Sequence, residues 1–238
     1  LAARMILRAH SIDLPVLDVP IDYELEHRPA IEANWRDAVA KQPRLWNGVQ
    51  FLFRNVRIED GVLRGTGYRS DYAAFLYWRA HRHEIGDRAA HIAATALPIM
   101  TDGGLLTVRM AAPTANAGNY YFPAGSLDGD DVIDGRLSID HNIARELSEE
   151  TGIEADFTNE PYIIAIDRGA WHVARRTRIA MGVEKARAHI QQHQMRTGDD
   201  ETDGVFGVFN VQDAQRLKTY ARMLAEWHFM TVSAETAA

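Results

Sequence analysis

Cysteine is absent from the 238 residues, so disulfide bonds, thiolate metal sites and cysteine nucleophiles are all excluded. Any metal bound by side chains must therefore use histidine or carboxylate ligands. Proline and glycine are scarce, at 8 and 17 residues, whereas apolar residues make up 46% of the chain. Disordered, collagen-like and low-complexity classes are therefore excluded, and the composition is that of a globular protein.

The sequence also lacks long hydrophobic runs and an excess of positive charge. No stretch approaches the roughly 20 apolar residues of a membrane helix, and residues 1–10 lack the pattern of a signal peptide. We therefore expect a cytoplasmic protein without a membrane partner. The 26 lysines and arginines are outnumbered by 33 acidic residues, a formal charge of −7, so no nucleic-acid partner is expected. A polyanionic substrate would need a cation or a few arginines nearby.

The length favours one large domain or one catalytic domain with an added piece, at roughly 100–200 residues per domain. A change in hydrophobic period near residue 90 predicts an accessory region over 1–90 and a catalytic domain over 91–238. The accessory region is predicted to contain a short helix over 29–40, a hairpin around Asp60-Gly61 with strands at 50–59 and 62–69, and a helix from Ser70-Asp71 to about Arg82.

The catalytic domain shows short strands that alternate with helices. Strand patterns cover 96–100, 105–110, 162–166, 173–183 and 205–210, and helical patterns cover 139–151, 184–194 and 211–223. This mixture favours an α+β or α/β sandwich.

Residues 145–153, RELSEETGI, carry the most chemical information. They stand at the end of a predicted helix, which Gly152 terminates. Glu146, Glu149 and Glu150 are spaced i, i+3 and i+4, so their carboxylates share one helix face. Like charges at this spacing, near a helix C-terminus whose dipole disfavours anions, destabilise the helix unless a cation compensates. Three hard oxygen donors on a rigid element are typical of a Mg²⁺ or Mn²⁺ site.

This stretch resembles the second half of the signature of the Nudix hydrolase superfamily, Arg-Glu-aliphatic-x-Glu-Glu-x-Gly-aliphatic, at every specified position. The resemblance implies an α+β fold of the Nudix type, an α/β/α sandwich with a mixed sheet, preceded here by an N-terminal α+β extension. It implies that Glu146 and Glu150 are the main ligands of Mg²⁺ or Mn²⁺. Glu149 would complete the cluster directly or through water, and Arg145 would orient the glutamates.

The first half of the signature is less regular. The family has a glycine, five residues, a glutamate and seven residues before the arginine. Pro123-Ala124-Gly125 resembles the strand end at its start, and by family analogy the carbonyl of Ala124 is a further metal ligand. Asp131 stands six residues after Gly125, at the position of the family's glutamate, and thirteen residues separate it from Arg145. We interpret this as a six-residue insertion in which one of four aspartates replaces the glutamate: Asp128, Asp130, Asp131 or Asp134.

A downstream acid is also implied, because the family often adds one from a loop before a late strand. The loop 198–204 contains four acids before the predicted strand over 205–210, and Glu201 is our candidate. The alternative is a merely solvated loop.

Other polar and aromatic residues are predicted to be structural. His189 and His193 are expected to be exposed helix residues rather than metal ligands. Arginines 175, 176 and 178 are expected on a hydrated sheet face, with phosphate binding by one of them as the alternative. A set of N-terminal aromatic residues is expected in the core rather than in a base-stacking platform: Trp35, Trp46, Phe51, Phe53, Tyr72, Phe75 and Trp78.

The resemblance implies a metal-dependent hydrolase of a diphosphate bond in a nucleoside diphosphate linked to another group, its small-molecule partner. The implied catalytic residues are Arg145, Glu146, Glu149, Glu150 and Glu201. Segments 42–47 and 68–72 resemble the UDP-glucose/UDP-galactose diphosphatase subgroup, which implies UMP and a sugar 1-phosphate as products. The alternatives are ADP-ribose or CoA as the substrate, or a Nudix-fold module that binds its ligand without hydrolysis. Homodimers are common in the family, but this chain has no interface signature, and its substrate-binding residues are not identified by the sequence.

Overall fold

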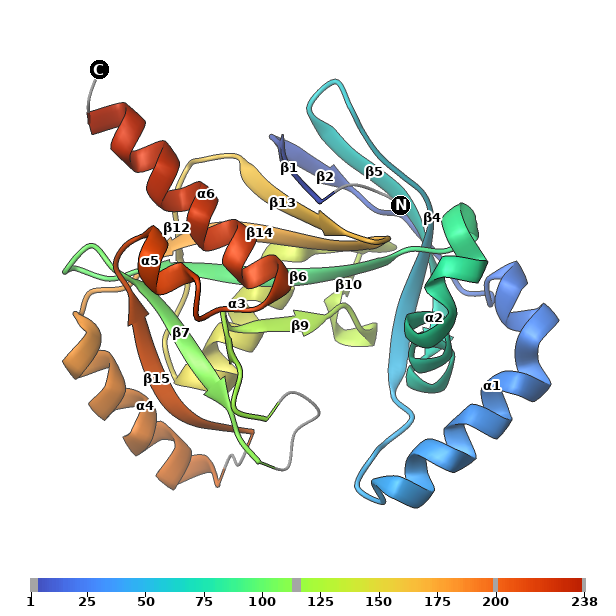
Figure 1. Cartoon of the computed structure of the whole chain (residues 1–238). Helices are drawn as coiled ribbons and strands as arrows, with labels where there is room; N and C mark the ends of the chain where they lie inside the picture. Colours follow the sequence, from blue (N-terminus) through green and yellow to red (C-terminus); the bar gives the residue numbers. More distant parts are fainter. Residues whose placement is uncertain (1–3, 113–116, 199–200, 237–238) are drawn as a thin grey trace.

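A nine-stranded mixed sheet forms the centre of the computed structural model, which describes residues 4–112, 117–198 and 201–236 (Figure 1). The main path of the sheet runs through β1 (Met5–Ala9), β13 (Tyr162–Asp167), β14 (Ala170–Arg178), β6 (His91–Ile99), β7 (Leu105–Met110) and β15 (Thr202–Val208). Three short strands pair with β7, β6 and β14 respectively: β8 (Tyr120–Tyr121), β9 (Ala124–Ser126) and β12 (Asp156–Phe157). Strands β14 and β6 run parallel, and the other pairs of this sheet are antiparallel.

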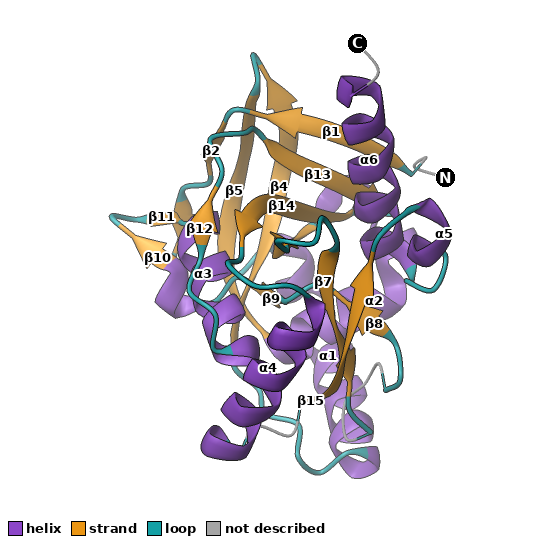
Figure 2. Cartoon of the chain, turned by 90° about the vertical axis from the view of Figure 1, so that its left-hand side faces the viewer, coloured by secondary structure: helices purple, strands orange, loops and turns teal. Residues whose placement is uncertain are grey.

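Helices cover both faces of this sheet (Figure 2). Helices α3 (Ile139–Thr151) and α4 (Val183–Thr197) lie on one face, and α5 (Val211–Ala214) and α6 (Thr219–Thr236) lie on the other. Alternate residues of β13 supply the two cores, since Ile164 packs on the α3 side and Ile163 on the α6 side. The predicted α+β class, with a mixed sheet between helix layers, is confirmed.

The N-terminal region adds a four-stranded sheet with two helices. Strands β2 (Ser11–Asp13) and β3 (Val16–Leu17) run parallel to β5 (Val62–Asp71), which forms a hairpin with β4 (Val49–Glu59). Helices α1 (Asp22–Lys41) and α2 (Tyr72–Ile85) share a core with β4, and η1 (Gly86–Arg88) leads into β6. Strand β1 belongs to the main sheet instead, where it pairs with β13. The division into 1–90 and 91–238 stays a prediction.

Local signals placed the hairpin and the start of α2 correctly. Asp60 and Gly61 form the turn with φ values of 51° and 73°, the left-handed pair that a two-residue hairpin loop requires. The side chain of Asp71 accepts a hydrogen bond from the backbone N–H of Ala74 at 2.8 Å and caps α2. Both predicted features are confirmed.

Two predicted helices have different bounds in the structure. Helix α1 begins at Asp22 rather than at residue 29, with Pro29 inside it. Its first turn is held by tertiary contacts that no local pattern shows, since the hydroxyl of Tyr23 donates to the carbonyl of Ala74 at 2.7 Å. The helix predicted over 211–223 is two helices, α5 and α6, because the chain turns between them and Thr219 adopts a φ of 44°.

The strand predicted over 173–183 is also shorter at its end. Strand β14 stops at Arg178, and Gly182 begins α4 as its N-cap residue. The insertion before α3 contains η2 (Gly129–Asp131) and the small hairpin of β10 (Val132–Ile133) and β11 (Arg136–Leu137).

Candidate active site

Helix α3 carries the three glutamates at its C-terminal end, with the bounds that the sequence predicts. It begins after Ser138, whose hydroxyl accepts from the backbone N–H of His141 at 3.2 Å. It ends at Gly152, whose φ of 70° is a left-handed conformation that favours glycine. A Cβ atom at Gly152 would lie 2.5 Å from Nδ1 of His193, so the close packing of α4 also requires glycine there.

Glu146 lies against the strand end at Gly125, on β9. A Cβ atom at Gly125 would be 1.9 Å from Oε1 of Glu146, so the absence of a side chain makes room for the carboxylate. The Glu146 side chain is 17% exposed. Burial raises the pKa of Glu146 to about 7, although the positive charge of Arg145 opposes this rise. Glu150 reaches the same strand, where its Oε1 accepts from the backbone N–H of Ala124 at 3.4 Å.

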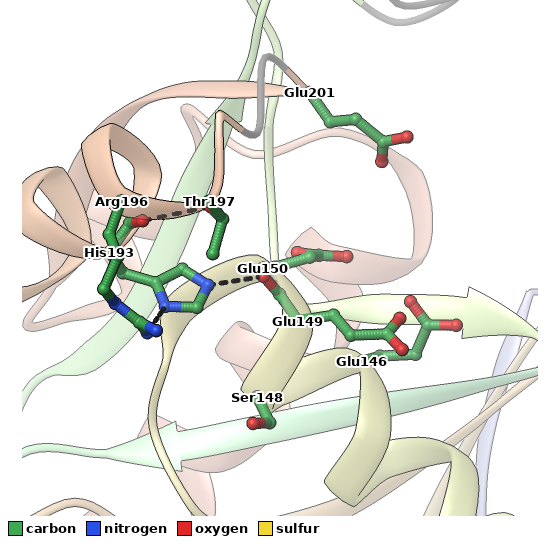
Figure 3. A pocket seen from close by; sticks show the side chains of 8 residues that line it. All are labelled: Glu146, Ser148, Glu149, Glu150, His193, Arg196, Thr197 and Glu201. Atoms are coloured by element: carbon green, nitrogen blue, oxygen red, sulfur yellow. Dashed lines mark hydrogen bonds between the residues drawn. The ribbon is translucent and has the colours of Figure 1, made fainter.

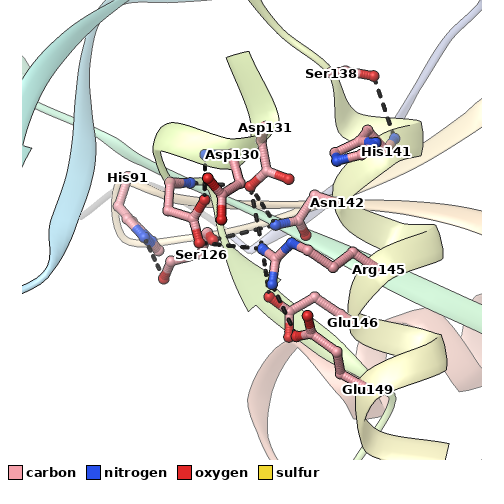
Figure 4. A network of polar contacts seen from close by, with 11 residues as sticks. His91, Ser126, Asp130, Asp131, Ser138, His141, Asn142, Arg145, Glu146 and Glu149 are labelled. Atoms are coloured by element: carbon pink, nitrogen blue, oxygen red, sulfur yellow. Dashed lines mark hydrogen bonds and ion pairs between the residues drawn. The ribbon is translucent and has the colours of Figure 1, made fainter. Parts of the chain in front are cut away.

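Arg145 is the centre of a carboxylate network (Figure 4). Its guanidinium lies 2.9 Å from Oε1 of Glu146 and 3.0 Å from Oε2 of Glu149. It also contacts the loop before α3, at 3.2 Å from Asp128 and 3.4 Å from Asp131. One cation therefore holds two of the glutamates and ties them to the insertion, which is the arrangement that an orienting arginine requires.

Asp131 makes the contacts that connect the insertion to the glutamate helix. It is completely buried, and its Oδ2 accepts from the backbone N–H of Asp128 at 3.0 Å and from Nδ2 of Asn142 at 2.8 Å. Asp128 caps η2 and shares the arginine. Asp130, by contrast, is exposed, and Asp134 lies in the turn between β10 and β11. Of the four candidate aspartates, Asp131 and Asp128 are therefore the two that contact Arg145.

Glu201 lies immediately before β15 and faces the same region as the glutamate helix (Figure 3). With Glu146, Glu149 and Glu150, it lines a pocket of about 490 Å³. The backbone carbonyl of Glu201 accepts from the N–H of Ala111 at 2.8 Å, which fixes the start of the strand. The structure thus brings Glu201 to the predicted site, whereas positions 199 and 200 of the same loop lie outside the described residues.

His193 and His189 are not the exposed helix residues that the sequence predicted. His193 is buried, and its Nε2 donates to the backbone carbonyl of Glu149 at 2.9 Å (Figure 3). Arg196 donates to Nδ1 of His193 at 3.1 Å, which assigns the proton of the neutral ring to Nε2. His189 reaches the carbonyl of Gly152 at 3.0 Å. Helix α4 thus satisfies carbonyls at the C-terminus of α3, a tertiary role that the i, i+4 spacing did not reveal.

A larger cleft of about 780 Å³ runs from the glutamates to the N-terminal region. Glu146, Glu150 and Glu201 line it, together with groups from the accessory region and from both sheet faces. The groups that sequence reasoning did not assign to the site are Phe75, Trp78, Arg79, Arg82, Tyr121, Arg168, His172 and Tyr220. These residues lie in four separate elements and one turn, so no sequence spacing could have grouped them.

The N-terminal aromatic residues divide between core and cleft. Phe51, Phe53 and Trp78 are fully buried, as expected for core residues, although Trp78 also lines the cleft. Trp46 is 81% exposed, so its predicted place in the core is wrong. It lies outside the hairpin strands and packs over Gly48 instead.

Two of the three arginines of β14 are covered by other side chains, whereas Arg178 at the end of the strand is exposed. Arg176 is buried, pairs with Glu160 and lies over the ring of Trp227 at 4.9 Å. Arg175 pairs with Asp140 on α3 and lies over the ring of Phe157 at 4.6 Å. The prediction of a hydrated face is wrong for Arg175 and Arg176, because acidic and aromatic partners from other elements cover them, and it is right for Arg178.

The donor set fits a hard divalent cation by its chemistry. Glu146, Glu149 and Glu150 present carboxylates next to the strand end at Ala124, and one arginine faces four carboxylates in the network. Crowded carboxylates of this kind are the oxygen ligands that Mg²⁺ and Mn²⁺ accept. In the positions they occupy here, no three acidic or histidine side chains of the described residues are close enough together to hold a metal ion.

The described part of the chain contains no helix long and apolar enough to cross a membrane. No protein-family model and no curated protein sequence matches the chain. Among solved structures, it is similar to the MutT protein from Methanosarcina mazei Go1, with a TM-score of 0.39 and 21% identity over 60% of this chain and 95% of that one.

Two further similar structures carry Nudix names. The NUDIX domain of Shewanella oneidensis NrtR, complexed with ADP ribose, has a TM-score of 0.37 and 11% identity over 63% of this chain and 89% of that one. RenU, a Nudix hydrolase from M. smegmatis, has a TM-score of 0.36 and 14% identity over 62% and 88%. All three TM-scores lie below 0.5.

Proposed function

We propose that this protein is a metal-dependent hydrolase of the Nudix type that cleaves the diphosphate bond of a nucleoside diphosphate linked to another group. The observation that carries this proposal is the glutamate face of α3. Helix α3 ends at Gly152, which has a left-handed conformation. Glu146 on the glutamate face packs against Gly125 of β9, which has no side chain, and Glu146 and Glu150 line the large cleft. The carboxylates are thus placed at the wall of a space large enough for a nucleotide.

In this proposal Glu146, Glu149 and Glu150, with the carbonyl of Ala124, hold Mg²⁺ or Mn²⁺. A cation bound there would neutralise phosphate charge and lower the pKa of an attacking water. Arg145 is a positioning residue, because its guanidinium holds Glu146 and Glu149 at 2.9 and 3.0 Å.

A carboxylate must also accept the proton of the attacking water, a step that contributes about 10²–10⁴-fold in enzymes. Glu149 and Glu201 are the two candidates. Both line the pocket beside the glutamate face, and Glu149 is the more exposed of the metal-binding candidates at 60%.

For the substrate we propose a UDP-sugar, with UMP and a sugar 1-phosphate as products. The support comes from the accessory region, because α2 supplies Tyr72 and Phe75 to the cleft that contains the glutamates, with Trp78 buried against Phe75. Aromatic rings provide a stacking surface for a base or a sugar. ADP-ribose and CoA are the competing substrates.

The test is phosphate-coupled turnover of UDP-glucose, UDP-galactose, ADP-ribose and CoA in Mg²⁺, Mn²⁺ or EDTA. Metal-dependent release of UMP from UDP-sugars alone supports the full proposal, and preference for an adenine nucleotide corrects the substrate. If nothing is hydrolysed while the ligands bind, and Glu149→Gln leaves their affinity unchanged, the chain is a binding module and the proposed activity is wrong.

A further inference from the structure

Three arginines line the part of the cleft that the N-terminal region encloses. Arg79 and Arg82 stand one turn apart on α2, and Arg168 stands in the turn between β13 and β14. Among residues 4–112, 117–198 and 201–236, no carboxylate lies within ion-pair distance of Arg79 or Arg82. Arg168 lies 3.2 Å from its neighbour Asp167, which also pairs with Arg4. This group of three, the arginine cluster, therefore carries net positive charge along the cleft.

Three positive charges crowd together in the arginine cluster. Burial lowers the pKa of the Arg82 guanidinium and the nearby positive charge of Arg168 lowers it further, while the negative charge of Asp167 opposes the shift. Arg79 adds a third positive charge and lies over the ring of Phe75 at 5.7 Å. An anion in this part of the cleft would relieve the repulsion between these side chains.

Backbone strain coincides with the same wall. Arg168 has a φ of 52°, in the left-handed region where glycine and asparagine are preferred. Thr219, a β-branched residue for which this conformation is still less favourable, has a φ of 44° and also lines the cleft. Strained residues held at a cleft are a feature of binding sites. Here the strain places a guanidinium at the cleft where an asparagine would make the turn at lower cost.

The arginine cluster and the glutamates lie at different points along β6. Ala94 pairs with Gly125, against which Glu146 packs, whereas His91 pairs with Ala170 at the end of the turn that carries Arg168. Three residues of a strand span roughly 10 Å. The ring of Phe75 lies beside His91, with centroids 4.4 Å apart, and lines the interval. A diphosphate at the glutamates and an anion at the arginine cluster would thus be separated by about the length of a sugar or a base.

Building on the proposed hydrolase function, we propose that the substrate carries a second anionic group, a carboxylate or a phosphate remote from the cleaved diphosphate, and that Arg79, Arg82 and Arg168 bind it. Among UDP-sugars this selects a uronate over an uncharged hexose. Among CoA-type substrates it selects the form that carries the additional ribose phosphate.

The test compares substrates that differ only in that group: UDP-glucuronate with UDP-glucose, and CoA with dephospho-CoA. We expect wild type to favour the charged member of at least one pair by about tenfold or more in kcat/KM, the effect of one charged hydrogen bond. The pair that responds distinguishes a carboxylate from a phosphate. Arg82→Gln and Arg168→Asn should remove the preference and leave the uncharged member within about threefold, since asparagine tolerates the left-handed turn. Arg88→Gln is the control, because Arg88 is exposed and pairs with Glu26 at 2.8 Å.

Equal rates for both members of each pair overturn the inference, as does an equal loss for both members in the variants, which would place the arginines on the shared diphosphate. Calorimetric binding of the same pairs in EDTA keeps the two proposals separate. Selective binding of the charged member without turnover contradicts the hydrolase and supports the arginine site. Turnover with equal rates and equal affinities for the two members of each pair supports the hydrolase and contradicts the arginine site.

Discussion

At the scale of single residues, two glycines determine where the glutamates can lie. Gly125 leaves the space that the Glu146 carboxylate occupies, and Gly152 ends α3 and admits His193. Neither position could hold a side chain without moving a candidate metal ligand or the helix that supports it. The geometry of the site therefore depends on two glycines whose lack of a side chain leaves them no group to bind a metal or transfer a proton.

Gly125→Ala is predicted to abolish metal-dependent turnover. The added methyl would lie 1.9 Å from Oε1 of Glu146, so the carboxylate must leave its position, and overpacking of this kind costs about 1–3 kcal/mol of stability. Steady-state kinetics and urea unfolding provide the measurements. Gly129→Ala is the matched control, because its Cβ meets nothing within 4 Å. Full activity of Gly125→Ala would show that Glu146 is not needed where the structure places it.

At the scale of elements, the glutamate helix is supported by its neighbour α4. The C-terminal carbonyls of a helix lack partners within it, and His193 and His189 supply donors to two of them. Since the carboxylates stand on this last turn, the packing of α4 influences their positions. Helix α4 thus contributes to the candidate active site by supporting α3 as well as by lining the pocket beside the glutamates.

His193→Leu is predicted to reduce kcat by about tenfold and to destabilise the fold by about 1–3 kcal/mol, because the buried carbonyl of Glu149 loses its donor. His193→Gln, which keeps a donor, should recover part of both losses. Gln192→Ala, an exposed position on the same helix, should behave as wild type. An unchanged kcat in His193→Leu would show that the contact from α4 does not influence the glutamates.

Elements with strong local signals could be predicted from the sequence, and those fixed by tertiary contacts could not. The bounds of α3 follow from Ser138, the apolar spacing and Gly152, and the hairpin follows from Asp60-Gly61. The early start of α1 depends instead on a hydrogen bond from Tyr23 to α2. The glutamate face was predictable because one helix holds it, whereas the arginine cluster joins α2 to a hairpin turn that lies far along the chain.

At the scale of the whole molecule, His91 lies where the N-terminal layer meets the main sheet. Its ring packs against Phe75 and Trp78 of α2, at centroid distances of 4.4 and 5.9 Å. Its Nε2 lies 3.2 Å from the hydroxyl of Ser126, the residue that follows Gly125 on β9. Burial lowers the pKa of His91 to about 3, and the positive charge of Arg79 adds to the effect. The junction between the two layers is therefore built around a neutral histidine.

Acid is predicted to weaken this junction. The unfolded chain protonates His91 near its ordinary pKa of 6.5, whereas the folded protein does so only near 3, so stability present above pH 6.5 is lost as the pH falls. Between pH 7.5 and 5, the free energy of unfolding of wild type should fall by about 2 kcal/mol more than that of His91→Gln. Urea unfolding at both pH values measures this difference. His83→Gln, on the exposed side of α2, should retain the wild-type pH dependence, and identical slopes in wild type and His91→Gln would contradict the account.

The proposed activity is hydrolysis of a phosphoanhydride by the glutamate face of α3 with a divalent cation. The most direct measurement is the initial rate on the best substrate of the panel, in Mg²⁺ and in EDTA, for wild type, Glu150→Gln and Glu154→Gln. Glu154 is an exposed acid just beyond the helix and outside the cleft. We expect turnover that EDTA abolishes, a loss of at least about 100-fold in Glu150→Gln, and a rate near that of wild type in Glu154→Gln. Turnover that persists in EDTA, or that survives in Glu150→Gln, would contradict the proposed activity.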